Sequence, residues 1–282
     1  MPIAEKRVAL PKCAFQTRVF TSGTGPPVLL LHGSPDSAVE WQPLMETLGE
    51  GWACFAPDLP GLGASGEPPP AFDYSREANN AFIDDVLAML SIAEPVTLVV
   101  HDIGGIFGIP WAAANLDRVR GIVITNTVIF EHFPWFGLAK IWSQRGPLGR
   151  AFAAAVMWQI GLFGGRIFRK AYRRISPELS ERDIDRVVEE FACNPVAKRS
   201  TLRLFRQMIP HTYFDGFDAM LSELIGRIPV RVVWGAPDPY IPPSFAQRFP
   251  TPIREVIEGA GHWVPISSAA QVARAVTAAL SE

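Results

Sequence analysis

The sequence predicts an α/β protein, in which helices cover both faces of a mostly parallel central sheet and a helical segment is inserted between two strands. Two observations indicate this fold class. Short, continuous runs of Val, Ile and Leu alternate with helical patterns, as expected for parallel strands that are buried on both faces. After residue 128 this alternation stops, and it resumes with a further strand at residue 228. The segment between is helical in pattern, so we expect it to fold as an insertion.

The predicted elements follow one another in a regular order. Residues 1–22 indicate one or two short strands. Each later strand is an apolar run bounded by turn residues, and the runs are PVLLLH (27–32), WACFAPD (52–58), VTLVVH (96–101), GIVITN (121–126) and IPVRVVWG (228–235). Helical patterns lie between them, around 39–49, 76–92 and 104–116. We therefore predict a core domain of residues 1–128 and 227–282, and a helical domain of residues 129–226, here called the insertion.

Length and composition limit the classes of function. The 282 residues are enough for one large domain with an insertion, and 48% hydrophobic with 19% charged residues favours a globular chain. The formal net charge of −2 gives no overall attraction to nucleic acid or to an anionic membrane. Cys13, Cys54 and Cys193 have no CxxC spacing, which argues against a disulfide framework or a metal site. We expect a cytoplasmic protein, because the N-terminus lacks a signal-peptide pattern and the longest apolar run (151–163) is too short to span a bilayer.

The insertion differs from the rest of the chain in charge. It holds 14 Lys and Arg against 10 Asp and Glu, a net charge of +4, which leaves −6 for the remainder. The stretch RIFRKAYRR (166–174) carries much of this excess at helical spacing. A solvated outer face explains the pattern, and attraction of anionic substrates is the alternative. We expect the aromatic residues of the insertion to pack on the sheet, with Trp135 and Trp142 lining a substrate pocket beneath.

The stretch VTLVVHDIGGIFG (96–108) places a carboxylate between a buried strand and a helix. Gly104 and Gly105 follow Asp102 closely, and a tight strand-turn-helix of this kind lets the central side chain project above the sheet. Position 100 is Val where Gly is common, so the small residues stand on one side of the turn only. The helix N-terminus favours a negative charge at this corner. An N-cap is the other role that Asp often has at such a position.

Five segments resemble the α/β-hydrolase family in their sequence and in their order along the chain. They are LLLHGSPDSAVEW (29–41), APDLPGLGASGEP (56–68), LVVHDIGGIFG (98–108), VVWGAPDPYIP (232–242) and EGAGHWVP (258–265). The chain is most similar to the branch that contains epoxide hydrolases and haloalkane dehalogenases, whose nucleophile is Asp. The resemblance covers about residues 30–126 and 228–281. It implies an α/β-hydrolase fold in which the insertion is the helical cap.

The residues at the expected strand ends predict a catalytic triad. Asp102 is the candidate nucleophile, His262 the base that activates water, and Asp238 the acid that orients this base. The order nucleophile, acid, base along the chain agrees with the family. The resemblance also implies an oxyanion hole formed by the backbone N–H groups of Ser34 and Ile103. Ser65, although it lies among glycines, follows a strand as part of a loop and is disfavoured as a nucleophile.

The resemblance implies two alternatives for the leaving group. Haloalkane dehalogenases hold a halide with the ring N–H of a Trp after the nucleophile, together with an Asn after HG or a Trp in the cap. This chain has Ile103 and Ser34 at the two core positions. Epoxide hydrolases use cap tyrosines as acids and commonly show HGxP and HD, which are present here as HGSP and HD. Tyr213 is the candidate cap acid, with packing as its alternative role. The candidates for a second acid are Tyr172, His132 and His211.

We expect a hydrolase that acts on a small apolar electrophile through an alkyl ester on Asp102, with an epoxide preferred and a haloalkane as the alternative. A serine would form an ether with such a carbon, which water and a His base cannot hydrolyse. A haloacid-type dehalogenase needs Arg where Ile103 stands. A non-catalytic ligand-binding protein of the same fold is the alternative from another class. The expected partners are the substrate and water, with no cofactor, metal, nucleic acid or membrane, and a homodimer is compatible with the sequence.

Overall fold

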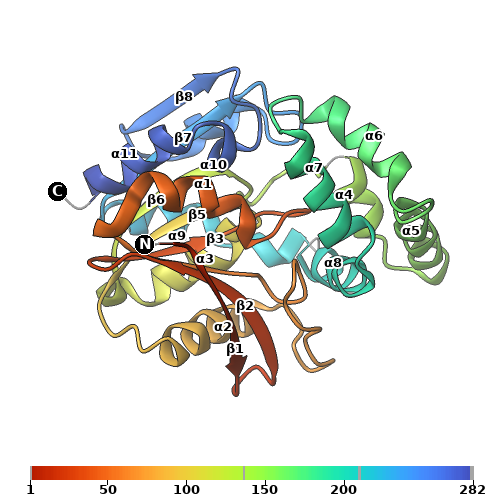
Figure 1. Ribbon diagram of the computed structural model, residues 1–282, viewed down its shortest axis with the longest axis horizontal. Coiled ribbons are helices and arrows are strands. Elements are labelled where there is room, and N and C mark those ends of the chain that lie inside the picture. The colour runs from red at the N-terminus through yellow and green to blue at the C-terminus, as the bar shows by residue number, and fades with distance from the viewer. Residues whose placement is uncertain (1, 136, 209–210, 280–282) are drawn as a thin grey trace.

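The computed structural model describes residues 2–135, 137–208 and 211–279, and it confirms the predicted α/β class. Its strands form a sheet in the order β1-β2-β4-β3-β5-β6-β7-β8 (Figure 1). The pairs β1–β2 and β2–β4 are antiparallel, and the other neighbouring pairs are parallel. The strands are β1 (Ala4–Leu10), β2 (Phe15–Ser22), β3 (Pro27–Leu31), β4 (Ala53–Pro57), β5 (Val96–Asp102), β6 (Val119–Thr127), β7 (Val230–Ala236) and β8 (Arg254–Glu258).

Helices cover both faces of this sheet. The α-helices are α1 (Gln42–Leu48), α2 (Arg76–Met89), α3 (Gly104–Ala114), α4 (Gly137–Trp142), α5 (Pro147–Ile160), α6 (Arg166–Ile175), α7 (Glu181–Val187), α8 (Pro195–Met208), α9 (Phe217–Ile225), α10 (Val264–Ser267) and α11 (Ala269–Ala279). Short helical turns are η1 (Ala38–Trp41), η2 (Gly49–Gly51), η3 (Leu116–Arg118), η4 (Val188–Ala192, a π-helix), η5 (His211–Phe214) and η6 (Pro243–Arg248). In Figure 1, α1, α10 and α11 lie on one face, and α2, α3 and α9 on the other. Within the described ranges, none of these helices has the length and apolar character needed to cross a bilayer.

The central strands are buried because both of their faces meet helices. Every residue of β5 is buried, and its side chains alternate between two hydrophobic clusters. Leu98 and Val100 belong to the cluster that includes Phe107 of α3, whereas Val99 belongs to the cluster that includes Val276 of α11. Alternation of this kind follows from the two-residue period of a strand. The continuous apolar runs of the sequence therefore correspond to strands with helices on both sides.

The insertion lies between β6 and β7, where the described residues form helices α4 to α9. Helices α4 to α8 gather at one side of the molecule, beyond the sheet (Figure 1). Helix α9 packs instead against α3 of the core. The division of the chain into two domains at residues 128 and 227 stays a prediction.

Buried ion pairs join the insertion to loops at the end of the sheet. The Arg18 guanidinium lies 2.7 Å from an oxygen of Asp58 and 2.7 Å from an oxygen of Glu190 in η4. Arg186 of α7 pairs with Asp36 in the loop after β3. Because these carboxylates are largely buried, removing one partner would leave a charge without compensation. The pairs hold the insertion in place over the carboxyl ends of the strands.

Candidate active site

The predicted tight turn is present at the end of β5. Asp102 is the last residue of this strand, and α3 begins two residues later at Gly104. The backbone of Asp102 is left-handed, with φ of +46°, a strained conformation for a residue with a side chain. A Cβ atom on Gly104 would lie 2.1 Å from the carbonyl oxygen of Leu31, which explains why only glycine fits there. The strain is maintained by the surrounding structure and directs the Asp102 side chain away from the sheet.

The structure brings together the three residues that the sequence singled out. His262 follows β8, Asp238 follows β7, and both meet Asp102 at the carboxyl end of the sheet. The Nδ1 atom of His262 lies 2.7 Å from Oδ2 of Asp238. The Nε2 atom of His262 lies 3.9 Å from Oδ2 of Asp102. The imidazole thus has one nitrogen fixed by an acid and the other facing the candidate nucleophile.

Asp238 is held as a carboxylate by several donors. Its Oδ1 atom accepts hydrogen bonds from the backbone N–H groups of Tyr240 and Ile241, at 2.7 and 2.9 Å. Its Oδ2 atom accepts a third from the amide of Asn126, at 2.7 Å. Burial alone would raise the pKa of Asp238, but the charge and hydrogen bond of His262 and the other donors lower it below its usual range. The acid stays ionised and fixes the orientation of the imidazole.

The same environment perturbs His262. Burial by itself would lower the pKa of the imidazole, but the nearby carboxylate of Asp238, followed by that of Asp102, raises it to about 9. The side chain is almost completely buried. At neutral pH the imidazole is therefore protonated as long as both carboxylates are charged.

The two oxygens of the Asp102 carboxylate have different surroundings. Oδ1 accepts a hydrogen bond of 3.0 Å from the backbone N–H of Ser34, in the loop after β3. Ile103 directly follows Asp102 at the N-terminus of α3, so its backbone N–H lies at the start of the helix. Oδ2 is the oxygen that faces His262. One carboxylate oxygen of Asp102 thus has a backbone donor, and the other oxygen faces the candidate base His262.

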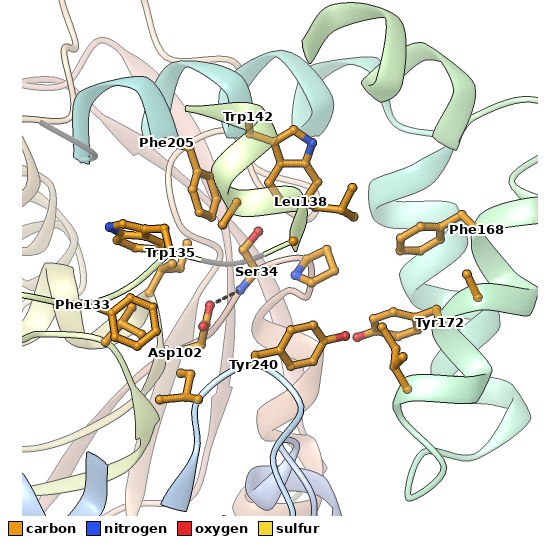
Figure 2. Close-up of a pocket in the computed structure, with 18 residues that line it drawn as sticks. Ser34, Asp102, Phe133, Trp135, Leu138, Trp142, Phe168, Tyr172, Phe205 and Tyr240 are labelled. Carbon is orange, nitrogen blue, oxygen red and sulfur yellow. Dashed lines mark hydrogen bonds between the residues drawn. The ribbon is translucent and has the colours of Figure 1, made fainter. Parts of the chain in front are cut away.

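Asp102 lines a cavity of about 280 Å³ that has mostly apolar walls (Figure 2). Its lining includes the two tryptophans that were expected there, Trp135 and Trp142. Ile103 and Ser34 also line it, beside Asp102. The other lining residues are Pro35, Val128, Phe133, Gly137, Leu138, Ala139, Phe168, Ala171, Tyr172, Ile175, Phe205, Tyr240 and Ile241. Such walls suit an apolar ligand.

Two tyrosines supply polar groups to this apolar cavity. Tyr172 comes from α6 and Tyr240 from the loop after β7, and Figure 2 shows their hydroxyl groups directed toward one another. The Tyr172 hydroxyl is buried and has no hydrogen-bond partner among the described residues. Burial raises the pKa of both phenols well above their usual range, so both stay protonated at neutral pH. Each can therefore donate a hydrogen bond to a ligand oxygen.

Tyr213, the expected cap acid, does not line this cavity. Its hydroxyl accepts a 3.2 Å hydrogen bond from Asn79, and its ring packs beside the guanidinium of Arg76. In the structure Tyr213 thus has contacts typical of packing, with residues of α2, and it lies outside the cavity that contains Asp102. His132 is exposed and does not line the cavity either, and the side chain of His211 lies outside the described residues.

Two positioning residues, Asn126 and Glu178, were not predicted from the sequence. Asn126, near the end of β6, binds Asp238 and both the N–H and the carbonyl of Gly235. Glu178, from the insertion, accepts a 3.1 Å hydrogen bond from the backbone N–H of His262. A polar residue at the carboxyl end of a buried strand is a signal that could have indicated Asn126. The sequence offers no comparable signal for Glu178, whose role depends on how the insertion packs.

The neighbouring histidine and the other candidate residues have structural contacts. Nδ1 of His101 lies 3.0 Å from the buried Glu40, and its Nε2 lies 3.1 Å from the backbone carbonyl of His262. His101 thus supports the loop that carries the base. Ser65 does not line the cavity that contains Asp102.

Comparison with known proteins places the chain among proteins of related fold. A family described as alpha/beta hydrolase fold matches residues 26–269. A cis-3-alkyl-4-alkyloxetan-2-one decarboxylase of Xanthomonas campestris is 35% identical over 122 residues, which span 39% of this chain and 41% of that protein. Haloalkane dehalogenase 2 of Mycobacterium bovis is 25% identical over 274 residues, or 90% of this chain and 87% of that protein. The match to the decarboxylase thus covers less than half of that relative's length.

Among solved structures, the epoxide hydrolase CorEH is similar over 99% of both chains, with a TM-score of 0.77 and 20% sequence identity. At this identity the similarity is one of fold. It extends over the sheet and the insertion alike, because nearly all of each chain is aligned.

Proposed function

We propose that this chain, which belongs to the alpha/beta hydrolase fold family, hydrolyses a small apolar epoxide through an ester formed on Asp102. One observation carries the proposal. The Asp102 carboxylate lines the same apolar cavity as the buried hydroxyl of Tyr172, for which the described residues offer no hydrogen-bond partner. Ring opening needs both a nucleophile and a group that receives the departing oxygen. In this proposal the insertion acts as a cap that supplies Tyr172.

The first step is attack of Asp102 on a ring carbon. Oδ2 forms the new bond to carbon, because Oδ1 is engaged by the N–H of Ser34. The ring carbon–oxygen bond breaks, and the oxygen takes the proton of the Tyr172 hydroxyl. This transfer is favourable because an alkoxide is a stronger base than a phenolate. The product of the step is a hydroxyalkyl ester of Asp102 and a Tyr172 phenolate.

Ester formation makes His262 available as a general base. In the free protein the negative charge of Asp102, 3.9 Å from His262, helps to keep the imidazole protonated. The ester is neutral, so the pKa of His262 falls and the imidazole releases a proton. This proton can restore the hydroxyl group of Tyr172, which is a phenolate at that stage. The neutral His262 is then available as a general base when water must be activated.

The second step is hydrolysis at the carboxyl carbon of Asp102. His262 takes a proton from water, and the hydroxide attacks this carbon. The negative charge that develops on Oδ1 is stabilised by the N–H groups of Ser34 and Ile103. The bond from the carboxyl carbon to Oδ2 breaks, so the diol leaves with Oδ2 and with the proton held by His262, and Asp102 returns its own proton to the imidazole. The oxygen atom of water thereby stays in the carboxylate of Asp102, and it can pass to the product only in a later turnover.

An oxygen leaving group fits the cavity better than a halide. The side chain after the nucleophile, Ile103, has no N–H, and Figure 2 shows the ring nitrogens of Trp135 and Trp142 on the sides of their rings away from Asp102. The two tyrosine hydroxyls are suited to an oxygen. Two of the similar proteins, an oxetanone decarboxylase and the epoxide hydrolase CorEH, are also named for strained oxygen rings.

Haloalkane dehalogenation is the second candidate, and one observation favours it. Trp142 lines the cavity, and its buried indole N–H has no hydrogen-bond partner among the described residues. A rotation of this ring would present a donor to a halide. The similarity to a haloalkane dehalogenase over most of the chain supports the same candidate.

Trapping the ester tests the proposal and separates the two candidates. His262→Gln removes the base and should accumulate a covalent adduct that intact mass spectrometry detects and peptide mapping places on Asp102. Styrene oxide should form this adduct rapidly, and 1-bromobutane slowly or not at all. Tyr172→Phe in the same background should slow adduct formation from the epoxide by roughly 10²-fold or more, without slowing any reaction with the bromide.

Tyr213→Phe is the matched control, since Tyr213 has the same chemistry outside the cavity. An adduct from the bromide but none from a panel of epoxides would favour dehalogenation. If native protein converted the epoxide during many turnovers in heavy-oxygen water and Asp102 stayed unlabelled, the covalent route would be wrong.

A further inference from the structure

Helix α5 is apolar on the side that faces solvent. Its only polar side chains are Arg150 and Gln159. The inner side packs on the protein through Ala153, Met157 and Ile160, which are buried. A helix that is hydrophobic all round is normally enclosed by protein or by lipid. In the part of the chain that the structure describes, one side of the helix is buried against protein and the other side is exposed.

The apolar exposure continues from α5 into α6. The large exposed side chains, with their exposed fractions, are Leu148 (87%), Phe152 (56%), Trp158 (65%), Phe163 (73%) and Ile167 (59%), which together are here called the α5–α6 face. Figure 1 shows α5 and α6 at the outer side of the insertion, far from the sheet. Clusters of exposed aromatic and aliphatic side chains mark sites of interaction with a membrane or another molecule.

Basic residues accompany this face without any acidic ones. Residues 132–177 contain eight Lys and Arg and no Asp or Glu. Arg169 and Arg173 of α6 form ion pairs with Glu181 of α7. Arg166, Lys170 and Arg174 are exposed on the same helix and form no salt bridge among the described residues. The cationic charge is thus local, in a chain whose formal net charge is −2.

We propose that the α5–α6 face docks on an anionic lipid surface. Phe152 and Trp158 would enter the interface between headgroups and acyl chains, and Lys170 and Arg174 would bind lipid phosphates. A second copy of this chain fits less well, because a symmetric contact through the face would bring two cationic segments together. This proposal departs from the expectation, drawn from the net charge, that the protein has no membrane partner.

The position of the face gives docking a consequence for the cavity. Leu138 of α4 and Ile175 of α6 line the cavity that contains Asp102, and both are also exposed. The cavity therefore opens beside the helix that carries the basic residues. Apolar substrates partition into bilayers, so a docked protein would receive them at this opening. This consequence rests on the proposed function, whereas docking itself does not.

Vesicle flotation tests the docking. The native protein should float with vesicles of phosphatidylcholine and phosphatidylglycerol at low salt, should float much less with phosphatidylcholine alone, and should be released by high salt. Phe152→Ser combined with Trp158→Ser should lower the partition coefficient more than ten-fold, and so should Lys170→Glu combined with Arg174→Glu. The matched controls are Met89→Ser and Val256→Ser, which remove exposed apolar side chains elsewhere and should leave flotation unchanged. Melting temperatures establish that each variant is folded.

Two outcomes would overturn the proposal. One is the absence of flotation with anionic vesicles at low salt. The other is a dimer in sedimentation velocity that Phe152→Ser with Trp158→Ser abolishes, since the face would then bind a second copy. Flotation requires no turnover, so its failure would leave the proposed hydrolysis untouched, and a failed adduct experiment would leave docking untouched.

Discussion

Replacing Asp102 by Asn should lower the pKa of His262, because it removes a negative charge 3.9 Å from Nε2 of the imidazole while keeping the shape of the side chain. The pKa starts at about 9 in the native protein. Two unit charges about 4 Å apart interact by about 4 kcal/mol at an effective dielectric constant of about 20, and by about 1 kcal/mol in bulk water. At about 1.4 kcal/mol per pKa unit, the expected fall is roughly one to three units. The imidazole would then titrate near neutral pH.

The assay is a nuclear magnetic resonance titration of the histidine ring nitrogens, which is practical because the chain has five histidines. His262→Gln identifies the signal. Asp102→Glu, which keeps the charge, should leave the pKa high, and Asp238→Asn should lower it further, because Asp238 is the stronger of the two carboxylate influences on His262. An unchanged pKa in Asp102→Asn would refute the mechanism in which ester formation releases the base. Such a result would mean that Asp238 alone determines the charge of the imidazole.

Three further outcomes follow from the packing and charges. Gly104→Ala should destabilise the fold by at least about 1–3 kcal/mol in urea unfolding, because its Cβ would lie 2.1 Å from a main-chain oxygen of Leu31 that cannot move aside. Arg18→Met should lower the free energy of unfolding by about 3–5 kcal/mol, since it leaves the buried Asp58 without its cation. Protonation of His262 stabilises the folded state, and this stabilisation is complete below about pH 6.5 and is lost as pH rises through about 9. The difference in free energy of unfolding between native protein and His262→Gln should therefore shrink by up to about 3 kcal/mol across that range.

Two of these outcomes have a matched control variant. Gly146→Ala should be nearly neutral, because an added Cβ there has no neighbour within 4 Å. Arg18→Lys keeps the charge and should be milder than Arg18→Met. A pH-independent difference between native protein and His262→Gln would contradict the raised pKa, and a fully stable Gly104→Ala would mean that the turn can relax.

The sequence by itself determined the sheet and the groups at its end. Continuous apolar runs specify buried parallel strands, and the carboxyl ends of such strands meet at one edge, so residues just after separate strands converge there. For this reason Asp102, Asp238 and His262 could be named from local context alone. The glycines after Asp102 indicate a tight turn in the sequence, but neighbouring strands impose them, because an added Cβ would meet Leu31 of β3 at Gly104 and Thr127 of β6 at Gly105.

Only the tertiary structure decided which groups complete the cavity. Tyr172 and Tyr213 are both tyrosines of the insertion, yet one lines the cavity and the other binds Asn79. Glu178 accepts a hydrogen bond from the backbone N–H of His262, although the two residues are 84 positions apart in the sequence. Helical periodicity indicates which residues share a face of a helix, but it does not indicate what that face packs against. The direction of each helix in the insertion depends on long-range packing and on buried ion pairs with the core, and these exist only once the chain has folded.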